Sequence, residues 1–191
     1  KSLGLTPTDE VVIYVGRLGE EKNLAMLIPM MEKLIRKRPN AKLVFVGDFD
    51  FRETLEEMAT ASRAAGKVLF AGRLPRDELS MAYQAAEVFV FPSLTDTQGL
   101  VIQEAAHTGL PLVLCDPDVS ECFHDGENGF LAKNTPRDVA AKIATILSDD
   151  KLRAKFSAHS KQLAESLGER TQTEKVVALF RRAMKEDQAL K

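Results

Sequence analysis

The stretch at residues 16–23, GRLGEEKN, carries two basic side chains between a β-branched run and a helical pattern. Arg17 offers a planar fork and Lys22 a mobile point charge, and both kinds of group bind phosphate in proteins. Gly16 lets the backbone turn tightly and approach a ligand closely. Lys22 also stands near the start of a predicted helix, where free N–H groups favour anions. The stretch has neither the G-x-G-x-x-G fingerprint nor the Walker pattern. It therefore predicts an anion-binding loop of another kind, or, on composition alone, a solvated basic loop.

A second stretch, residues 93–104, follows another predicted strand and enters a helix. Asp96 lies in its loop part, and Glu104 follows eight positions later, about one and a half turns into the helix. Unpaired N–H groups at residues 99–101 would favour an anion. A carboxylate on such a helix can accept two neighbouring hydroxyls, as acidic residues do with ribose in nucleotide-binding folds. The segment thus suits a sugar nucleotide. Its plainer alternative is a helix capped by Asp96 or Thr97, with Glu104 solvated.

Other side chains capable of chemistry are scattered along the chain. The histidines are His107, His124 and His159, and their positions favour a helix end, a turn-rich loop and a helix surface. No Ser/His/Asp or Cys/His arrangement has support from local spacing. Cys115 and Cys122 are too few for a disulfide framework or a zinc site, so we expect two buried thiols in a reducing compartment. We therefore expect no metal site.

These loops need a scaffold, and the chain supplies short apolar runs that alternate with helix-length segments. Fully apolar strands that alternate with helices are typical of a parallel sheet covered on both faces. Right-handed crossovers then make it a doubly wound, Rossmann-like α/β fold, in which ligands bind beyond the carboxyl ends of the strands. Strands are predicted at residues 11–15, 42–46, 67–72, 88–91, 110–115 and 130–131, and helices at 24–38, 51–65, 75–86 and 98–107.

From residue 136 onward the pattern predicts helix only, so the sheet would carry extra C-terminal helices. Apolar residues recur there at helical spacing in three stripes, each of which predicts a buried helix face. The stripes are Val139, Ile143 and Ile146; Leu152, Phe156, Leu163 and Leu167; and Val176, Val177, Phe180 and Met184.

The composition is that of a globular domain: of 191 residues, 45% are hydrophobic and 28% charged, with a net charge of −2. So small a charge gives no basic field that would attract nucleic acid, and we expect no such partner. No apolar run approaches the ~20 residues that span a bilayer. The N-terminal segment has no apolar signal core. We therefore expect a cytoplasmic location.

Taken together, these segments resemble the C-terminal domain of the retaining GT-B glycosyltransferases of family four, the glycosyl transferases group 1. VVIYVGRLGEEKN looks like the family's first strand and phosphate loop, and KLVFVGDFD looks like its second strand and loop. The stretch VLFAGRLPRDELSMAYQAAEVFVFPS resembles the run from the base-binding loop to the fourth strand. TDTQGLVIQEAAHTGLPLV looks like the acidic-x₇-Glu segment, and HDGENGFLA looks like the D-G-x-N-G-F-L turn. The match covers residues 8–185, with the segments in the family's order.

The resemblance implies that the chain binds a nucleoside-diphosphate sugar, of the UDP-glucose or GDP-mannose type, for hexose transfer without a metal. Arg17 and Lys22 would bind the diphosphate and stabilise it as the leaving group. Asp96 would hold hydroxyls of the donor sugar, and Glu104 those of the ribose. Gly16 would keep the loop open for the acceptor and the sugar. The other implied binding residues are Asp48, Arg73 and Leu74 near the nucleobase, and Gly99, Leu100 and Val101 at the sugar and phosphate.

The chain departs from the family pattern at three places. The family usually has Glu where this chain has Asp96, and often Phe where it has Gln98. The loop at residues 48–50 lacks the usual second glycine. The segment D-T-Q-G-L at residues 96–100 resembles the E-T-Q-G-L of some diacylglycerol glucosyltransferases in this family, which favours a glycolipid product.

The family's enzymes have two domains of similar size, and the N-terminal one holds the acceptor site. The resemblance thus implies that residues 1–191 are the donor-binding half of a protein about twice as long, without its N-terminal acceptor domain. That other half would select a lipid or glycan acceptor, and a lipid acceptor would bring the parent to the cytoplasmic membrane. Alone, this half should transfer nothing, and Phe and Leu residues at the exposed cleft would favour self-association.

Two alternatives belong to other classes of protein. One is an enzyme of different chemistry on a similar fold, such as a UDP-sugar epimerase or a relative of glycogen or sucrose-phosphate synthase. The other is a degenerate, non-catalytic domain that only binds a partner. The presence of Arg17, Lys22 and Glu104 together disfavours the second alternative.

Overall fold

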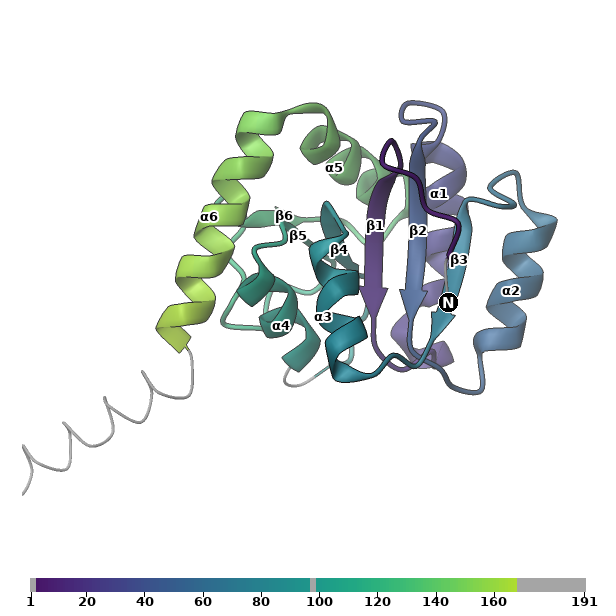
Figure 1. Cartoon of the computed structure of the whole chain (residues 1–191), viewed down its shortest axis with the longest axis horizontal. Helices are drawn as coiled ribbons and strands as arrows, with labels where there is room; N and C mark the ends of the chain where they lie inside the picture. The colour runs from purple at the N-terminus through teal and green to yellow at the C-terminus, as the bar shows by residue number, and fades with distance from the viewer. Residues whose placement is uncertain (1–2, 97–98, 168–191) are drawn as a thin grey trace, which may run out of the picture.

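Six parallel strands form a single sheet in the part of the chain that the computed structural model describes, residues 3–96 and 99–167 (Figure 1). The strand order is β3-β2-β1-β4-β5-β6, which is the order of a doubly wound Rossmann-like sheet. The predicted fold class is therefore confirmed. The strands are β1 (Glu10–Val15), β2 (Ala41–Val46), β3 (Val68–Gly72), β4 (Val88–Phe91), β5 (Leu112–Leu114) and β6 (Gly129–Leu131).

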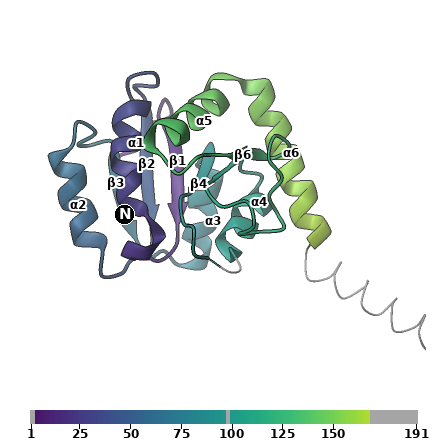
Figure 2. The ribbon, with the colours of Figure 1, turned by 180° about the vertical axis from the view of Figure 1, so that it is seen from behind.

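Helices cover both faces of this sheet. In Figure 1, α3 and α4 lie in front of the sheet, and α1 and α5 lie in front of it when it is seen from behind (Figure 2). α6 packs against α4 and α5. Within the described ranges, no helix has the length and apolar character needed to cross a membrane. The helices are α1 (Leu27–Leu34), α2 (Arg52–Ala61), α3 (Arg76–Gln84), α4 (Leu100–Thr108), α5 (Pro136–Ser148) and α6 (Asp150–Leu167), with the 3₁₀ turns η1 (Glu20–Lys22) and η2 (Leu24–Met26) before α1.

A row of aromatic rings crosses the sheet near the carboxyl ends of its strands. Tyr14 of β1 lies between Phe45 of β2 and Phe91 of β4, with ring centroids 5.8 Å away on either side. Phe70 of β3 continues the row at 5.2 Å from Phe45. Such ring pairs add to the stability that their burial already provides. The row forms a packed floor beneath the loops that leave these strands.

The first helix is shorter than the sequence pattern predicted. Residues 24–38 were expected to be helical, but α1 spans Leu27–Leu34 and only a 3₁₀ turn precedes it. Pro29 lacks an N–H and fits an α-helix only in its first turn, so the helix begins close before it. Pro39 disfavours helical backbone in the residue that precedes it, which limits the other end.

Other boundaries also differ from expectation. β5 is shorter than residues 110–115, and Pro111, just before the strand, cannot donate a hydrogen bond to the sheet. His107 lies within α4 rather than after it, because the helix continues to a left-handed Gly109 with φ 86°. The first two C-terminal stripes lie on α5 and α6. The third stripe, at residues 176–184, lies outside the described residues.

Candidate functional site

The loops singled out in the sequence meet at one edge of the sheet. β1 and β4 are neighbours, yet the helices that follow them, α1 and α4, lie on opposite faces. The direction of winding reverses between these two strands, and open α/β sheets bind ligands in the crevice at such a point. Residues 16–23 leave β1 there and residues 92–96 leave β4, so both loops border the crevice.

Backbone packing holds the loop after β1 in place. The N–H of Gly16 donates to the carbonyl oxygen of Val46 at 3.0 Å. A Cβ on Gly47, which has φ 133°, would lie 1.9 Å from the carbonyl oxygen of Gly16, so a side chain there is excluded. The Tyr14 hydroxyl donates to the carbonyl oxygen of Arg17 at 3.1 Å. The backbone beneath Arg17 is therefore fixed by both β1 and β2.

An ion pair joins the loops that follow β1 and β4. Lys22 Nζ donates to Asp96 Oδ1 at 2.7 Å, and the two side chains are only 15% and 21% exposed. Water screens such a pair less than it screens a surface pair. Asp96 Oδ2 is buried and has no hydrogen-bond partner among the described residues. A buried carboxylate oxygen left unsatisfied is costly, and it suits a ligand hydroxyl that could donate to it.

Asn23 fixes Lys22 at the crevice. Its backbone is left-handed, with φ 58°, a conformation that Asn tolerates better than most residues. Its Nδ2 donates to the Pro92 carbonyl oxygen at 3.2 Å and to Asn134 Oδ1 at 2.7 Å. The loop after β1 is thereby bonded both to the end of β4 and to the segment before α5.

Arg17 lies at the outer rim of the crevice. Its guanidinium is ion-paired with Glu21 and lies over the Phe49 ring, 4.6 Å from the ring centroid. A hydrogen bond from its own backbone N–H, and to a lesser degree Arg17, lowers the pKa of the Glu21 carboxyl, so Glu21 is ionised at neutral pH. An anion that binds Arg17 must therefore compete with Glu21.

α4 begins in the crevice itself. Gly99 precedes it with φ 48°, and a Cβ there would lie 2.8 Å from a neighbouring carbonyl oxygen. No side-chain hydrogen bond caps this helix, so Asp96 is not its cap, and Thr97 lies outside the described residues. The first N–H groups of a helix, here those of Leu100 and Val101, have no intrahelical partner and carry the positive end of its dipole.

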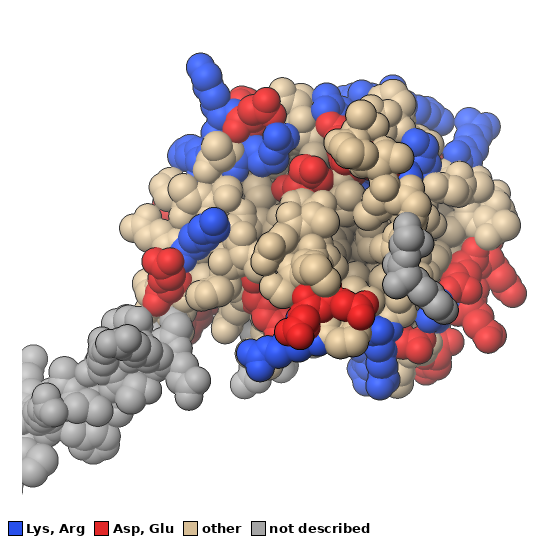
Figure 3. All heavy atoms as spheres, in the orientation of Figure 1, with Lys and Arg blue, Asp and Glu red and all other residues tan. Residues whose placement is uncertain are grey.

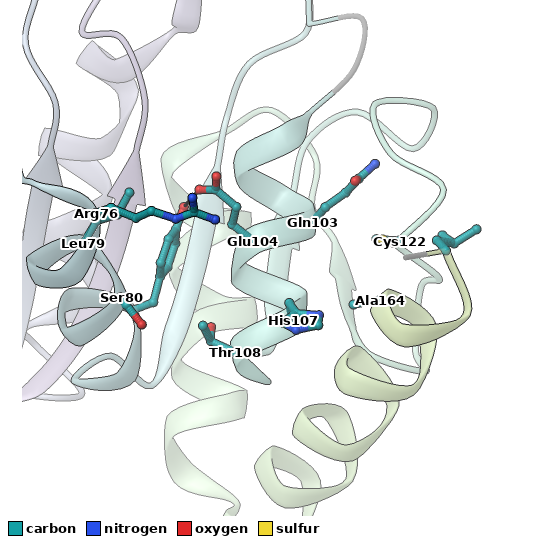
Figure 4. A pocket seen from close by; sticks show the side chains of 11 residues that line it. Arg76, Leu79, Ser80, Gln103, Glu104, His107, Thr108, Cys122 and Ala164 are labelled. Carbon is teal, nitrogen blue, oxygen red and sulfur yellow. Dashed lines mark hydrogen bonds between the residues drawn. The ribbon is translucent and has the colours of Figure 1, made fainter. Parts of the chain in front are cut away.

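Glu104 faces α3 from the next turn of α4 (Figure 4). Its Oε2 accepts a hydrogen bond of 3.0 Å from the Tyr83 hydroxyl. Tyr83 is buried, which raises the pKa of its phenol well above the usual range, so the hydroxyl stays protonated. The hollow around Glu104 has a volume of about 400 Å³ and is lined in part by Arg76, Leu79 and Gln103. Glu104 is exposed, as the plainer alternative requires, but its carboxylate is also held by a partner.

The loops after β2 and β3 border a second hollow, of about 360 Å³. Its lining includes Asp48, Arg73 and Leu74. Asp48 Oδ1 lies 3.8 Å from Arg52 Nη1 at the start of α2. Leu74 packs in part against the core, whereas Arg73 is exposed. This hollow thus has a partly apolar wall beside charged groups.

The hollows adjoin one another along the carboxyl edge of the sheet. Leu79 lines both the hollow at Glu104 and the hollow at Leu74. Gly16 and Arg17 line both the second hollow and a third, of about 310 Å³. The predicted site residues line this run of hollows: Gly16, Arg17, Lys22, Asp48, Arg73, Leu74, Asp96, Gly99, Leu100, Val101 and Glu104.

Sequence reasoning missed the residues that support the site from below. Tyr14 bonds to the backbone of Arg17, and Tyr83 bonds to the carboxylate of Glu104. Asn23 bonds the loop that carries Lys22 to the end of β4. No local spacing joins Tyr83 to Glu104, since they are 21 positions apart on different helices. For Asn23 the sequence does carry a signal, since an Asn before a predicted helix is favoured in left-handed turns.

The two cysteines are not activated as nucleophiles, although Cys122 lines the hollow at Glu104. Cys122 is buried and Cys115 is half-buried, and burial raises the pKa of the Cys115 thiol to about 11. Nowhere in residues 3–96 and 99–167 do three His, Cys, Asp or Glu side chains gather as a metal site requires. On the face seen in Figure 3, basic and acidic side chains are interspersed rather than gathered into a basic surface.

Comparison with known proteins agrees with this architecture. The model of the family "Glycosyl transferases group 1" matches residues 1–163. The chain belongs to this family. Sulfoquinovosyl transferase SQD2 of Arabidopsis thaliana is 37% identical to this group 1 chain over 175 residues, which cover 89% of the chain and 33% of SQD2. Alpha-monoglucosyldiacylglycerol synthase of Acholeplasma laidlawii is 31% identical over 134 residues, which cover 69% of the chain and 34% of the synthase. The chain thus spans about a third of the length of these relatives.

Solved structures of glycosyltransferases share the fold of this group 1 chain. The pneumococcal O-GlcNAc transferase GtfA, solved in complex with UDP and GlcNAc, superimposes with a TM-score of 0.77 at 23% sequence identity. The match covers 97% of the chain and 38% of GtfA. The resemblance to GT-B glycosyltransferases, inferred from five sequence segments, is therefore confirmed.

Proposed function

We propose that this chain is the nucleotide-sugar-binding domain, and so the C-terminal half, of a retaining GT-B hexosyltransferase. The observation that carries the proposal is the Lys22–Asp96 pair at the point where β1 and β4 part, with α4 beginning beside it. One hollow there contains a cation, a buried carboxylate oxygen in need of a donor, and a helix N-terminus. A nucleoside-diphosphate sugar has the matching groups, namely phosphates and hydroxyls.

Two cations and a helix N-terminus would hold the diphosphate. Arg17 supplies a planar fork and Lys22 a point charge, and the amides of Leu100 and Val101 lie at the positive end of the α4 dipole. Negative charge builds on the diphosphate as the bond to the sugar breaks. Groups already in place around the diphosphate would stabilise that charge in the transition state. The proposed reaction therefore requires no metal ion.

Asp96 would hold the donor sugar. Its Oδ1 accepts from Lys22, while its Oδ2 is buried without a hydrogen-bond partner in the described part of the chain. A sugar hydroxyl that donates to Oδ2 would remove this penalty. Because Asp is one methylene shorter than the Glu usual in the family, the sugar would lie closer to the backbone of the loop between β4 and α4.

The two neighbouring hollows would take the nucleoside. Glu104 can accept from both ribose hydroxyls, as acidic residues do in other nucleotide-binding sheets. Arg73 and Leu74 line the adjoining hollow, where the backbone near Leu74 would read the edge of the base. Asp48 borders the same space.

For the donor we propose a UDP-glucose or GDP-mannose type of compound, and for the acceptor a lipid or a glycan. One relative is named as an alpha-monoglucosyldiacylglycerol synthase, and GtfA was solved with UDP, which supports a uridine nucleotide and a glycolipid product. The acceptor would bind to an N-terminal domain outside this chain. An enzyme with a lipid acceptor would act at the cytoplasmic surface of a membrane.

Calorimetric titration of the chain with UDP, GDP, ADP and pyrophosphate, without metal, tests the proposal. We expect one nucleotide to bind in preference to the others. The Glu104→Ala variant should weaken the binding of that nucleotide and leave pyrophosphate unaffected, because pyrophosphate has no ribose. If the wild-type chain bound none of the nucleotides at millimolar concentration, the proposal would be wrong and a degenerate binding domain would be favoured.

A further inference from the structure

Glu104 is an exposed residue on a helix surface, and its long side chain would be free to rotate if nothing held it. Recognition of two neighbouring ribose hydroxyls requires a carboxylate of fixed orientation, since each misplaced hydrogen bond loses most of its strength. A neighbouring group must therefore fix this carboxylate before a nucleotide binds.

Tyr83 provides the one hydrogen bond to this carboxylate that is seen among the described residues. Tyr83 belongs to α3, is 2% exposed, and packs its ring 6.3 Å from the ring of Phe89 in β4. Its hydroxyl lies 3.0 Å from Glu104 Oε2 and 3.4 Å from the Val101 carbonyl oxygen. The shorter distance and the negative charge of the carboxylate make Glu104 its main acceptor.

The chemistry of the pair leaves Glu104 able to bind a ligand. An ionised carboxylate has about four acceptor positions, and Tyr83 occupies only one of them. The phenol stays protonated and so remains a hydrogen-bond donor, because burial and the neighbouring carboxylate raise its pKa. The remaining acceptor positions of Glu104 border the hollow that it lines with Arg76 and Gln103 (Figure 4).

We propose that Tyr83 is a positioning residue for ribose recognition: its buried hydroxyl holds Glu104 in the orientation that accepts the 2′- and 3′-hydroxyls of the donor nucleotide. This inference rests on the proposed function, since it assigns a support to a residue of the same site. α3 follows the loop of Arg73 and Leu74. Through the Tyr83 hydroxyl, this helix is bonded to Glu104, the proposed ribose-binding residue.

A purely structural role for Tyr83 makes a different prediction. If the hydroxyl served only to join α3 to α4, its removal would lower stability and would affect ribonucleotides and 2′-deoxyribonucleotides equally. If it orients Glu104, its removal reduces the preference for the ribonucleotide itself.

The test uses the Tyr83→Phe variant, which keeps the buried ring and loses only the hydroxyl. The probes are the nucleoside diphosphate that the wild-type chain prefers among UDP, GDP and ADP, its 2′-deoxy form, and pyrophosphate. We expect the affinity of Tyr83→Phe for the ribonucleotide to fall about 3- to 10-fold, which is the effect of one hydrogen bond. The ratio of ribo to deoxy affinity should fall with it, and pyrophosphate binding should not change.

Two further variants keep the result interpretable. Gln84→Ala removes the exposed side chain next to Tyr83 on the same helix, and it should bind all probes like the wild type. In the Glu104→Ala background, Tyr83→Phe should have no further effect, because its partner is gone. Thermal unfolding checks that each variant is folded.

The outcomes separate the two proposals. If Tyr83→Phe keeps the wild-type ratio of ribo to deoxy affinity while Glu104→Ala loses it, the positioning role is overturned and the proposed function stands. An equal loss from Tyr83→Phe with and without Glu104 would also overturn the positioning role. If the wild-type chain binds no nucleotide, both proposals fall.

Discussion

Lys22 and Asp96 determine the charge that the proposed donor site presents, because each is the partner of the other. Arg17 and Glu21 form a second such pair at the rim. The four charges sum to zero, so the attraction for a diphosphate must come from the α4 dipole and from the donors that these pairs leave free. Exposed charge pairs are screened by salt, so we expect the part of the binding that depends on Arg17 to weaken as ionic strength rises.

Replacing Lys22 tests the phosphate role at the scale of one residue. Lys22→Ala should weaken binding of the preferred nucleoside diphosphate by about 1.5–3 kcal/mol, the range for a charge-assisted hydrogen bond. Calorimetric titration measures the change, and Lys33→Ala, an exposed lysine on α1, is the matched control. Equal affinity of Lys22→Ala and wild type would show that Lys22 does not contact the phosphates.

Asp96 should matter for the sugar and not for the nucleotide. Asp96→Asn keeps the shape of the side chain, removes its charge and frees Lys22, so the affinity for UDP should stay or rise. The additional affinity that a UDP-sugar has over UDP should fall by about 1 kcal/mol, because an amide replaces the proposed acceptor. Titration of UDP and UDP-glucose into this variant and into the control Asp77→Asn measures both effects. Equal losses for UDP and UDP-glucose would contradict the sugar role.

Some glycines lie so close to the backbone of a neighbouring strand that a side chain would not fit there. A Cβ on Gly129, at the start of β6, would lie 1.9 Å from the carbonyl oxygen of Leu112 in β5. Gly129→Ala should therefore destabilise the chain by about 3 kcal/mol, because backbone must move to admit the methyl group. Gly66→Ala, where the added Cβ meets open space at φ 75°, should cost only about 1 kcal/mol. Urea unfolding compares the two; similar values would show that the sheet yields freely at β6.

The sequence was most informative where periodicity decides the outcome. Alternating apolar strands and helices predict a parallel sheet, and a parallel sheet brings its loops to one edge, so Lys22 and Asp96 meet although they are 74 positions apart. Helix ends were less predictable, since Pro29 shortened the first helix. The D-G-x-N-G pattern predicts a turn but does not show that Asn128 within it is buried. Asn128 donates to the Cys122 carbonyl oxygen and accepts from the His124 N–H, and these contacts depend on packing that no local pattern records.

Apolar side chains remain exposed along the carboxyl edge of the whole molecule. Phe49 and Leu94, in the loops after β2 and β4, are 41% and 47% exposed. In the proposed two-domain enzyme these loops face the other domain, so this chain alone should associate with itself weakly.

Sedimentation velocity over a range of concentrations tests this expectation. We expect the apparent mass of the chain to rise with concentration, and Leu94→Ser to reduce that rise. Met81→Ser, which replaces an equally large exposed side chain on α3 outside these loops, should have no effect. A chain that stays monomeric throughout, or equal effects of both variants, would contradict an interface at this edge.

The proposed function requires that the crevice between β1 and β4 binds a nucleoside-diphosphate sugar. The most direct measurement is the change of backbone amide chemical shifts when the ¹⁵N-labelled chain is titrated with UDP and with GDP, since it detects weak binding and locates it. We expect one nucleotide to shift the amides of residues 16–23, 73–74 and 99–104 together, and to leave the amino edge of the sheet unchanged. Shifts elsewhere on the molecule, or none with either nucleotide, would contradict it.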